Sequence, residues 1–323
     1  MKVLNESPFR ARVLAVDRRE QRHAVLIAKA TYDLGADGTL SLAAEQMPLV
    51  ADVLETPFGT FHCELFFKKQ GVDLCVLGSV RRATPVERAR VQLSVGARRW
   101  ALSVCGDRRW LRGADGRLVP SKPEPFVELA LGYAQAFGGS QTFDDGRELT
   151  FADNPRGRGY YFDEEQAEGR AVANVEDAAQ PPVSEWRAEH AVAGWGPYPS
   201  YWGLRGRANV LIDEASAEVR KVLPGLFNHA HPQLVLEQLL PGEAIQLEGL
   251  HAQPIAFRVP RPPATADVRI GDRTTSIEAP IDGVFLWADV RKVVVTQRAR
   301  FPYRVRAEEP RSLTVRANVS RES

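Results

Sequence analysis

Residues 89–104 read ARVQLSVGARRWALSV, and their alternation of apolar and polar side chains decides the fold class. Val91, Leu93 and Val95 point to one face of an extended chain, while the polar residues between them point to the other. Gly96-Ala97 then forms a tight turn, and a second alternating strand fills the rest of the stretch. One buried face and one solvated face are typical of antiparallel β structure, so the stretch predicts a hairpin within a β meander.

Alternation and β-branched residues extend outward from this hairpin in both directions. Towards the N-terminus they predict strands at residues 9–16, 23–34, 39–42 and 72–80, with a hairpin turn at Asp37-Gly38. Further strands are predicted at 245–250, 255–259, 266–270, 274–277, 283–287 and 292–296, and residues 312–319 are expected to be an edge strand or a frayed end. We therefore predict a mainly β protein with two antiparallel lobes, each sandwich- or barrel-like.

The predicted lobes cover residues 1–131 and 225–300, with a tail or edge strand at 301–323 and a loop-rich aromatic connector at 132–224. Regular periodicity fails between residues 132 and 199, and a segment of this length without it is either disordered or functional. The segment has too many aromatic residues for a solvated linker, so we expect most of it to pack against the β scaffold. A short helix is predicted at 213–222, DEASAEVRKV, because its acidic start and basic end suit the helix dipole and Pro224-Gly225 would stop it.

The stretch from Tyr133 to Tyr161 has the composition of a built surface, with glycines at positions that favour close backbone approach. Aromatic and arginine side chains are enriched at protein interfaces, although any single aromatic could serve as internal packing. We predict that the exposed part of this platform binds a partner protein. The predicted partner-binding residues are Tyr133, Phe137, Gly138, Gly139, Asn154, Pro155, Arg156, Gly157, Arg158, Gly159, Tyr160, Tyr161, Trp195, Tyr198 and Trp202.

Composition gives the broad class. The net charge of +1, from 42 basic and 41 acidic residues, provides no global basic field for nucleic acid or an anionic membrane. Charged residues interrupt the N-terminal segment where a signal peptide would need an apolar core, and no run approaches the length of a membrane span. A soluble, cytoplasmic protein without membrane insertion is expected. Cys63, Cys75 and Cys105 lie in apolar segments without a CxxC pair, and we expect buried free thiols.

Motifs for chemistry are weak. His229 and His231 share one face if that segment is extended, but no third ligand stands at a recognisable spacing, so no metal or other cofactor is predicted. No nucleophile elbow, zinc-protease helix or phosphate loop occurs in the sequence. Asp107-Arg108-Arg109-Trp110 is interpreted as a solvated strand end. No catalytic residues are predicted, although a carboxylate pair for glycoside hydrolysis stays open.

Seven motifs occur in an order that resembles the domain-of-unknown-function 2169 family of bacteria. They are CGDRRW at 105–110, YAQAFGGS at 133–140, NPRGRGYY at 154–161, VANVED at 172–177, GWGPYPSYW at 194–202, LFNHAHPQ at 226–233 and LLPGEAIQLEGL at 239–250. The resemblance implies an association with type VI secretion, in which members are regarded as adaptors or chaperones that help load effectors onto the VgrG and PAAR-repeat spike. It offers no catalytic residues.

We therefore expect a non-enzymatic adaptor whose partners are a secreted effector and the spike proteins. Two alternatives remain open at this point. One is a carbohydrate-active or carbohydrate-binding β protein whose aromatic loops stack sugars, and the other is a structural subunit associated with the spike. A pocket with convergent carboxylates of raised pKa would favour the enzyme, and a symmetric oligomer would favour the structural subunit.

Overall fold

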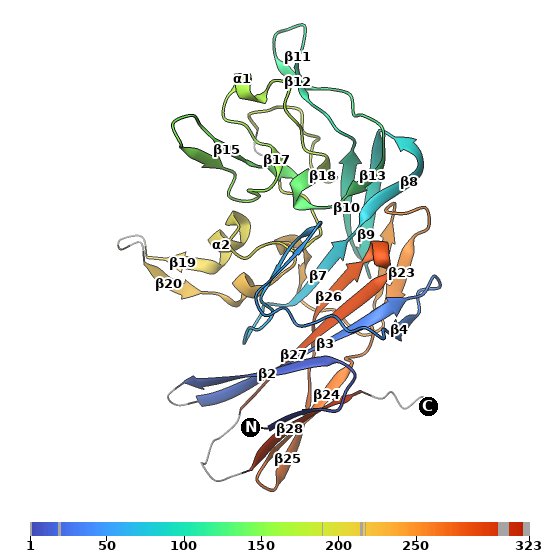
Figure 1. Cartoon of the computed structure of the whole chain (residues 1–323), viewed down its shortest axis with the longest axis vertical. Coiled ribbons are helices and arrows are strands. Elements are labelled where there is room, and N and C mark those ends of the chain that lie inside the picture. Colours follow the sequence, from blue (N-terminus) through green and yellow to red (C-terminus); the bar gives the residue numbers. More distant parts are fainter. Residues whose placement is uncertain are drawn as a thin grey trace.

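A computed structural model describes residues 2–18, 21–188, 190–213, 216, 218–302 and 310–318 (Figure 1). The chain is mainly β with a few short helices, which confirms the predicted fold class. Among the described residues no helix has the length and apolar content needed to cross a membrane.

The largest sheet has seven strands and brings the two ends of the sequence together. Its order is β2-β3-β27-β26-β7-β21, with β4 paired to β3, and only β7 and β26 run parallel to each other. The strands are β2 (Arg10–Arg18), β3 (Gln21–Leu34), β4 (Leu40–Leu42), β7 (Val72–Leu77), β21 (Val235–Leu236), β26 (Ile281–Trp287) and β27 (Lys292–Pro302). Every residue of β7 is buried, as expected for a strand covered on both faces.

A five-stranded sheet contains the hairpin predicted from residues 89–104. Its order is β18-β10-β9-β22-β23, comprising β9 (Arg88–Val95), β10 (Arg98–Cys105), β18 (Val175–Asp177), β22 (Ala244–Glu248) and β23 (Ile255–Arg258). Val91, Leu93 and Val95 are fully buried, which confirms the predicted face. They share one hydrophobic core with Leu74 of β7 and Val284 of β26, so this core lies between the two large sheets.

A smaller sheet of four strands packs against the other part of the seven-stranded sheet, at the bottom of Figure 1. Its order is β1-β28-β24-β25, comprising β1 (Lys2–Asn5), β24 (Ala264–Ile270), β25 (Arg273–Glu278) and β28 (Arg311–Ala317). Leu26 of β3 and Phe301 of β27 meet Val268 and Leu313 in a second core. This core covers one face of β3, which carries Ala24, Leu26, Ala28 and Ala30.

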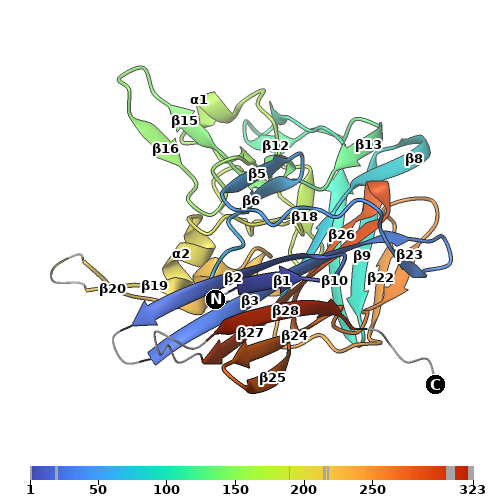
Figure 2. The same ribbon diagram turned by 60° about the horizontal axis from the view of Figure 1, so that its bottom comes forward.

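The remaining strands form two-stranded ribbons outside these sheets, several of which are labelled in Figures 1 and 2. They are β5 (Val53–Thr56) with β6 (Gly59–His62), β8 (Ser79–Val86) with β13 (Phe126–Ala130), β11 (Trp110–Arg112) with β12 (Leu118–Pro120), β14 (Phe137–Gly138) with β17 (Arg158–Gly159), β15 (Ser140–Thr142) with β16 (Glu148–Thr150), and β19 (Val210–Ile212) with β20 (Val219–Val222). The helices are α1 (Glu164–Ala167) and α2 (Gly203–Asn209), with 3-10 turns η1 (Tyr133–Gln135), η2 (Pro224–Phe227), η3 (Pro232–Leu234) and η4 (Ala288–Val290).

The predicted helix at 213–222 is wrong. Residues Val219–Val222 are strand β20, which pairs antiparallel with β19, and residues 214, 215 and 217 lie outside the described residues. β-Branched residues at the ends of the segment favour extended pairing, and this preference outweighs the weak dipole pattern of its charges. The helix of this region is α2, which begins directly after Trp202.

Two other differences concern the ends of the chain. The expected tail at 301–323 contains β28, an internal strand between β1 and β24, so it is neither an edge strand nor a frayed end; residues 303–309 and 319–323 lie outside the described residues. In addition, each of the two largest sheets combines strands from residues 1–131 with strands from the predicted C-terminal lobe. Local alternation predicts strands but contains no information about which distant strand becomes the neighbour.

Candidate functional site

The predicted aromatic platform lies mostly inside the protein. Tyr133, Phe137, Trp195, Tyr198 and Trp202 are each 3% exposed or less, so their expected placement at a partner-binding surface is wrong. The rings of Tyr133, Tyr198 and Trp202 meet edge to face, with centroids 5.2–5.5 Å apart. Such packing gives bulky aromatics their stabilising effect in a core and leaves these faces unavailable to a protein or a sugar.

Asn154 and the glycines close this packing. The Asn154 side-chain amide donates to the carbonyl oxygens of Tyr133 (2.8 Å) and Phe137 (3.0 Å). Gly138 has φ of +146°, and a Cβ there would lie 2.2 Å from the Asn154 carbonyl oxygen. Among the other glycines predicted to bind a partner, Gly139 and Gly159 are also buried, and Gly157 is half-buried. These residues serve backbone packing.

The rest of the predicted set reaches the surface to different degrees. Arg156 is exposed, and its guanidinium donates to Thr60 Oγ1 (2.6 Å) and Glu55 (3.1 Å). Arg158 is half-buried and donates to Asn174 Oδ1 (2.9 Å). Pro155, Tyr160 and Tyr161 are also half-buried. Of the predicted partner-binding residues, therefore, only Arg156 is exposed, and a few others are half-buried.

The motif at 105–110 is also an interior element. Arg108 is 3% exposed and forms an ion pair with buried Glu176 at 2.5 Å, so the interpretation as a solvated strand end is wrong for this residue, whereas Asp107 and Arg109 are exposed. Trp110 is fully buried. Glu176 lies in β18, beyond the reach of any local sequence pattern. Cys75 and Cys105 are buried free thiols, as predicted, whereas Cys63 is half-buried.

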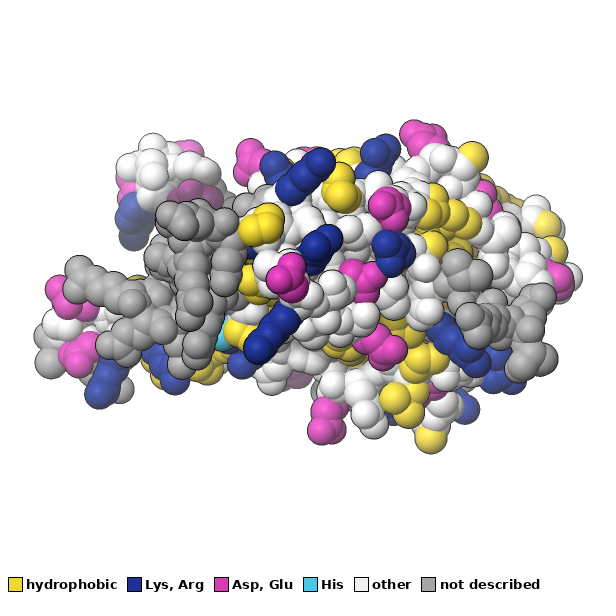
Figure 3. Space-filling view, turned by 90° about the horizontal axis from the view of Figure 1, so that it is seen from below, with side chains coloured by type: hydrophobic (Ala, Val, Ile, Leu, Met, Phe, Trp, Pro, Cys, Tyr) yellow, Lys and Arg dark blue, Asp and Glu magenta, His cyan; other side chains and the backbone are white. Residues whose placement is uncertain are grey.

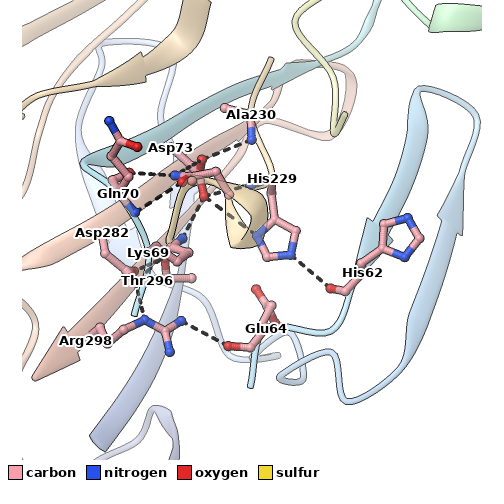
Figure 4. A network of polar contacts seen from close by, with 12 residues as sticks. His62, Glu64, Lys69, Gln70, Asp73, His229, Ala230, Asp282, Thr296 and Arg298 are labelled. Atoms are coloured by element: carbon pink, nitrogen blue, oxygen red, sulfur yellow. Dashed lines mark hydrogen bonds and ion pairs between the residues drawn. The ribbon is translucent and has the colours of Figure 1, made fainter. Parts of the chain in front are cut away.

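A buried charge network joins distant parts of the chain (Figure 4). The Asp73 carboxylate accepts hydrogen bonds from Lys69 Nζ (2.7 Å), Asn228 Nδ2 (2.9 Å) and the backbone N–H groups of His229 (3.0 Å) and Ala230 (3.1 Å). Burial alone would raise the pKa of Asp73, but Lys69 and these donors outweigh it and hold the pKa well below its ordinary value. Asp73 therefore stays ionised and fixes the 228–230 segment beside β7.

A second carboxylate extends the network to β26 and β27. Asp282 accepts from Arg298 Nε and Thr296 Oγ1, each at 2.7 Å, and lies 3.6 Å from Lys69 Nζ. Burial opposes ionisation of Asp282, but Lys69 and Arg298 lower its pKa. Arg298 also donates to the backbone carbonyl oxygens of Glu64 (3.0 Å) and Phe66. The arrangement holds loop 64–72 against the sheet, and both carboxylates are poor proton donors near neutral pH.

The two histidines of the 226–233 motif face different surroundings. His229 Nε2 donates to the His62 carbonyl oxygen (3.0 Å), and its ring packs on Phe61 and Phe285. His231 packs against the rings of Tyr133 and Tyr198 instead. Burial, followed by the charge of Arg205, lowers the pKa of His231 to about 4. Within the described ranges, no three His, Cys, Asp or Glu side chains are grouped to hold a metal ion.

A groove of about 550 Å³ lies on the outer side of this network and is lined in part by Lys69, Asp282 and Arg298. Its other walls come from loop 67–72 and from residues 237–241, which follow β21. No sequence motif indicates this site, because the residues that line it are widely separated along the chain.

The β19–β20 ribbon, called the arm from here on, is the most exposed aliphatic element of the connector. Its register pairs Val210 with Val222 and Ile212 with Val219, with a register shift between Leu211 and Ile212. Ile212, Val219 and Val222 are 56%, 61% and 42% exposed. Within the described part of the chain, no third strand pairs with the arm, which projects from the body in both ribbon views (Figures 1 and 2).

These observations define a mainly β protein with a packed aromatic connector, a buried charge network, an open groove and a projecting arm. Comparison with known families matches residues 19–298 to DUF2169, described as "Uncharacterized protein conserved in bacteria". The chain belongs to this family, in agreement with the resemblance of its seven motifs. The searches of curated proteins and of solved structures gave no match.

Proposed function

We propose that this chain is a non-enzymatic adaptor or chaperone that binds a type VI secretion effector and helps load it onto the VgrG and PAAR-repeat spike. The class of partner rests on the family resemblance. The observation that carries protein binding is the arm, with its exposed apolar side chains and with strand edges that no third described strand pairs.

The chemistry of the arm suits a protein partner. A two-stranded ribbon is marginally stable alone, and a further strand or an apolar surface is what such ribbons gain on association. Unpaired N–H and C=O groups on an edge strand can accept a strand from another chain, while Ile212 and Val219 supply apolar contact. Strand addition combined with apolar burial is a recurring mode of peptide and protein recognition.

Two observations favour binding over the carbohydrate alternative. The connector rings that would stack a sugar are buried against one another. The buried carboxylates Asp73 and Asp282 are held ionised by Lys69 and Arg298, whereas glycoside hydrolysis needs one carboxyl group that stays protonated. Their surroundings suit ion pairing.

The test is co-expression of the chain with the effector and spike proteins encoded beside its gene, followed by affinity capture and size-exclusion chromatography. We expect a stable complex with the wild-type chain and at least a tenfold loss of capture with Ile212→Ser/Val219→Ser. The matched control is Val119→Ser/Val127→Ser, which removes two exposed valines from other ribbons, 43% and 49% exposed, and should leave capture unchanged.

Three results would contradict this proposal in different ways. If the wild-type chain elutes without any of these partners under several salt conditions, the adaptor function is wrong. If both double variants capture equally well, the arm is not the contact surface. A symmetric oligomer of the chain alone, measured by light scattering, would favour the structural-subunit alternative.

A further inference from the structure

The groove described above lies beside the central core, since Val72, Leu239 and Ile281 belong to both. Val72 at the start of β7 and Ile281 at the start of β26 contribute to its floor, and Pro262 and Pro280 flank it beside the four-stranded sheet. Its volume of about 550 Å³ falls within the range of sites that bind a ligand or a few residues of a peptide.

The walls of the groove are apolar and rigid. Leu239 and Ile281 are 6% and 7% exposed at the base, whereas Phe67 and Leu240 are 43% and 55% exposed. The lining prolines lack an N–H donor and hold their own backbone fixed, so they offer contact area without a polar group that needs a partner. Such walls suit bulky apolar side chains that enter from outside.

The lining of the groove carries more positive than negative side chains. Its lining contains Lys68, Lys69, Arg298 and Arg300 but only two carboxylates, Glu237 and Asp282. Lys69 and Arg298 are neutralised by the buried network. Lys68 and Arg300 are exposed and have no partner among the described residues, and together with exposed Glu237 they give the accessible rim a net charge of +1.

We infer that this groove binds an extended segment of a partner protein in which bulky apolar residues are followed by aspartate or glutamate. The apolar residues occupy the walls formed by Phe67, Leu240 and the prolines, and the carboxylate pairs with Lys68 and Arg300 at the rim. This inference rests on the proposed adaptor function and specifies the chemistry of the segment that is held. Phe67 and Leu240 are exposed, so the apolar wall of the groove is open to solvent. An open wall allows a peptide side chain to enter while the rest of the partner protein stays outside.

A peptide-display selection tests the inference directly. The probe is a library of random decapeptides, selected on the wild-type full-length chain and counter-selected on Lys68→Glu/Arg300→Glu. The binders are then synthesised with a fluorophore and measured by fluorescence anisotropy. We expect enriched sequences that place Asp or Glu after bulky apolar residues, and about tenfold weaker binding to the charge-reversed variant. Leu240→Asp should weaken binding by a similar factor.

The matched control is Lys122→Glu/Arg273→Glu, which changes the net charge equally at two exposed cations outside the groove lining. It should bind the selected peptides as the wild type does. In addition, replacing the acidic residue of a selected peptide by lysine should weaken binding to the wild type and restore it to Lys68→Glu/Arg300→Glu. All variants are compared at equal folded fraction, measured by circular dichroism.

The inference is overturned if the selection yields no binder, if the binders lack acidic residues, or if both charge-reversed variants bind them equally. Its failure can be distinguished from failure of the proposed function. If an effector complex survives Lys68→Glu/Arg300→Glu but not the arm variant, the adaptor function is supported and binding in the groove is contradicted. If the selected peptides bind but no effector complex forms, peptide binding in the groove is supported and the effector is not its partner.

Discussion

The connector has two parts that are close in the sequence but opposite in exposure: the packed aromatic cluster around Trp202 and the arm. Trp202 is 2% exposed, whereas Val219 is 61% exposed. Trp202 packs edge to face against Tyr198 of its own segment and against Tyr133, which comes from η1. Val219 belongs to a ribbon that meets no third described strand. Side-chain size alone therefore does not locate a binding surface; the number of neighbouring elements decides which apolar residues stay uncovered.

The strongest test of this contrast is Trp202→Ala. Removing a fully packed indole leaves a cavity and should lower the free energy of unfolding by about 3–5 kcal/mol. Urea denaturation followed by circular dichroism measures the effect. The control is Tyr201→Ala, because Tyr201 is 63% exposed and should contribute less than about 1 kcal/mol. Equal losses for the two variants would refute the distinction between the packed connector and its surface.

The second test concerns the close backbone approach within the connector. Gly138→Ala combines a φ of +146° with a Cβ 2.2 Å from the Asn154 carbonyl oxygen, so we expect a loss of about 2–3 kcal/mol of stability. Gly146→Ala has a φ of +82° but no atom within 4 Å of the new Cβ, and should cost about 1 kcal/mol. Thermal and urea unfolding of both variants provide the comparison, and a larger effect at Gly146 would contradict it.

The third test uses pH. His231 packs on the aromatic cluster, and burial lowers its pKa to about 4 from an ordinary value of 6.5. Between these values the unfolded chain binds more protons at this residue than the folded chain, so stability falls as the pH drops. This residue should cost the wild type about 2 kcal/mol between pH 7 and pH 5.

The same pH series on His231→Gln isolates that contribution. The variant cannot titrate at position 231, so its stability should fall by about 2 kcal/mol less than that of the wild type over the interval. Other titrating groups cancel in the difference. Parallel curves for the two proteins would mean that the His231 ring is accessible to protonation in the folded state.

The smallest expected effect is at the arm. Ile212→Ser/Val219→Ser replaces side chains that are more than half exposed and should change the free energy of unfolding by less than about 1 kcal/mol. Urea unfolding of the isolated chain measures it. Set beside the expected loss of partner capture, this separates a surface kept for binding from one needed for folding. A loss comparable to that of Trp202→Ala would show that the arm is part of the core.

The sequence predicts local structure well where a face is buried. Strands β9, β10 and β22 follow their alternation, since one side of each packs into the central core. The sequence does not predict which strands pair with each other. Val222 pairs with Val210, and no local pattern shows that this contact overrides the helix-like charges between them.

The candidate sites are less accessible to sequence reasoning for the same reason. Lys69 and Asp73 meet Asp282 and Arg298 only after the ends of the chain have come together, and each residue looks like a surface charge when read alone. Glycine and aromatic motifs indicate a built region, but burial shows that most of it was built for packing. Exposure, which separates the arm from the connector, is a property of the assembled fold.

The pairing of β3 with β27 determines when the largest sheet can form during synthesis of the chain. Lys292 lies opposite Asp33, so β3 must wait for most of the chain to be translated before its second neighbour exists. At ribosomal speeds of about 5–20 residues per second the delay is roughly 10–50 seconds. During that time the apolar edge of a strand buried in the finished protein is open to wrong partners. The late pairing with β27 therefore makes the β3 edge the part of this chain with the longest unpaired interval during synthesis that the register of the largest sheet indicates.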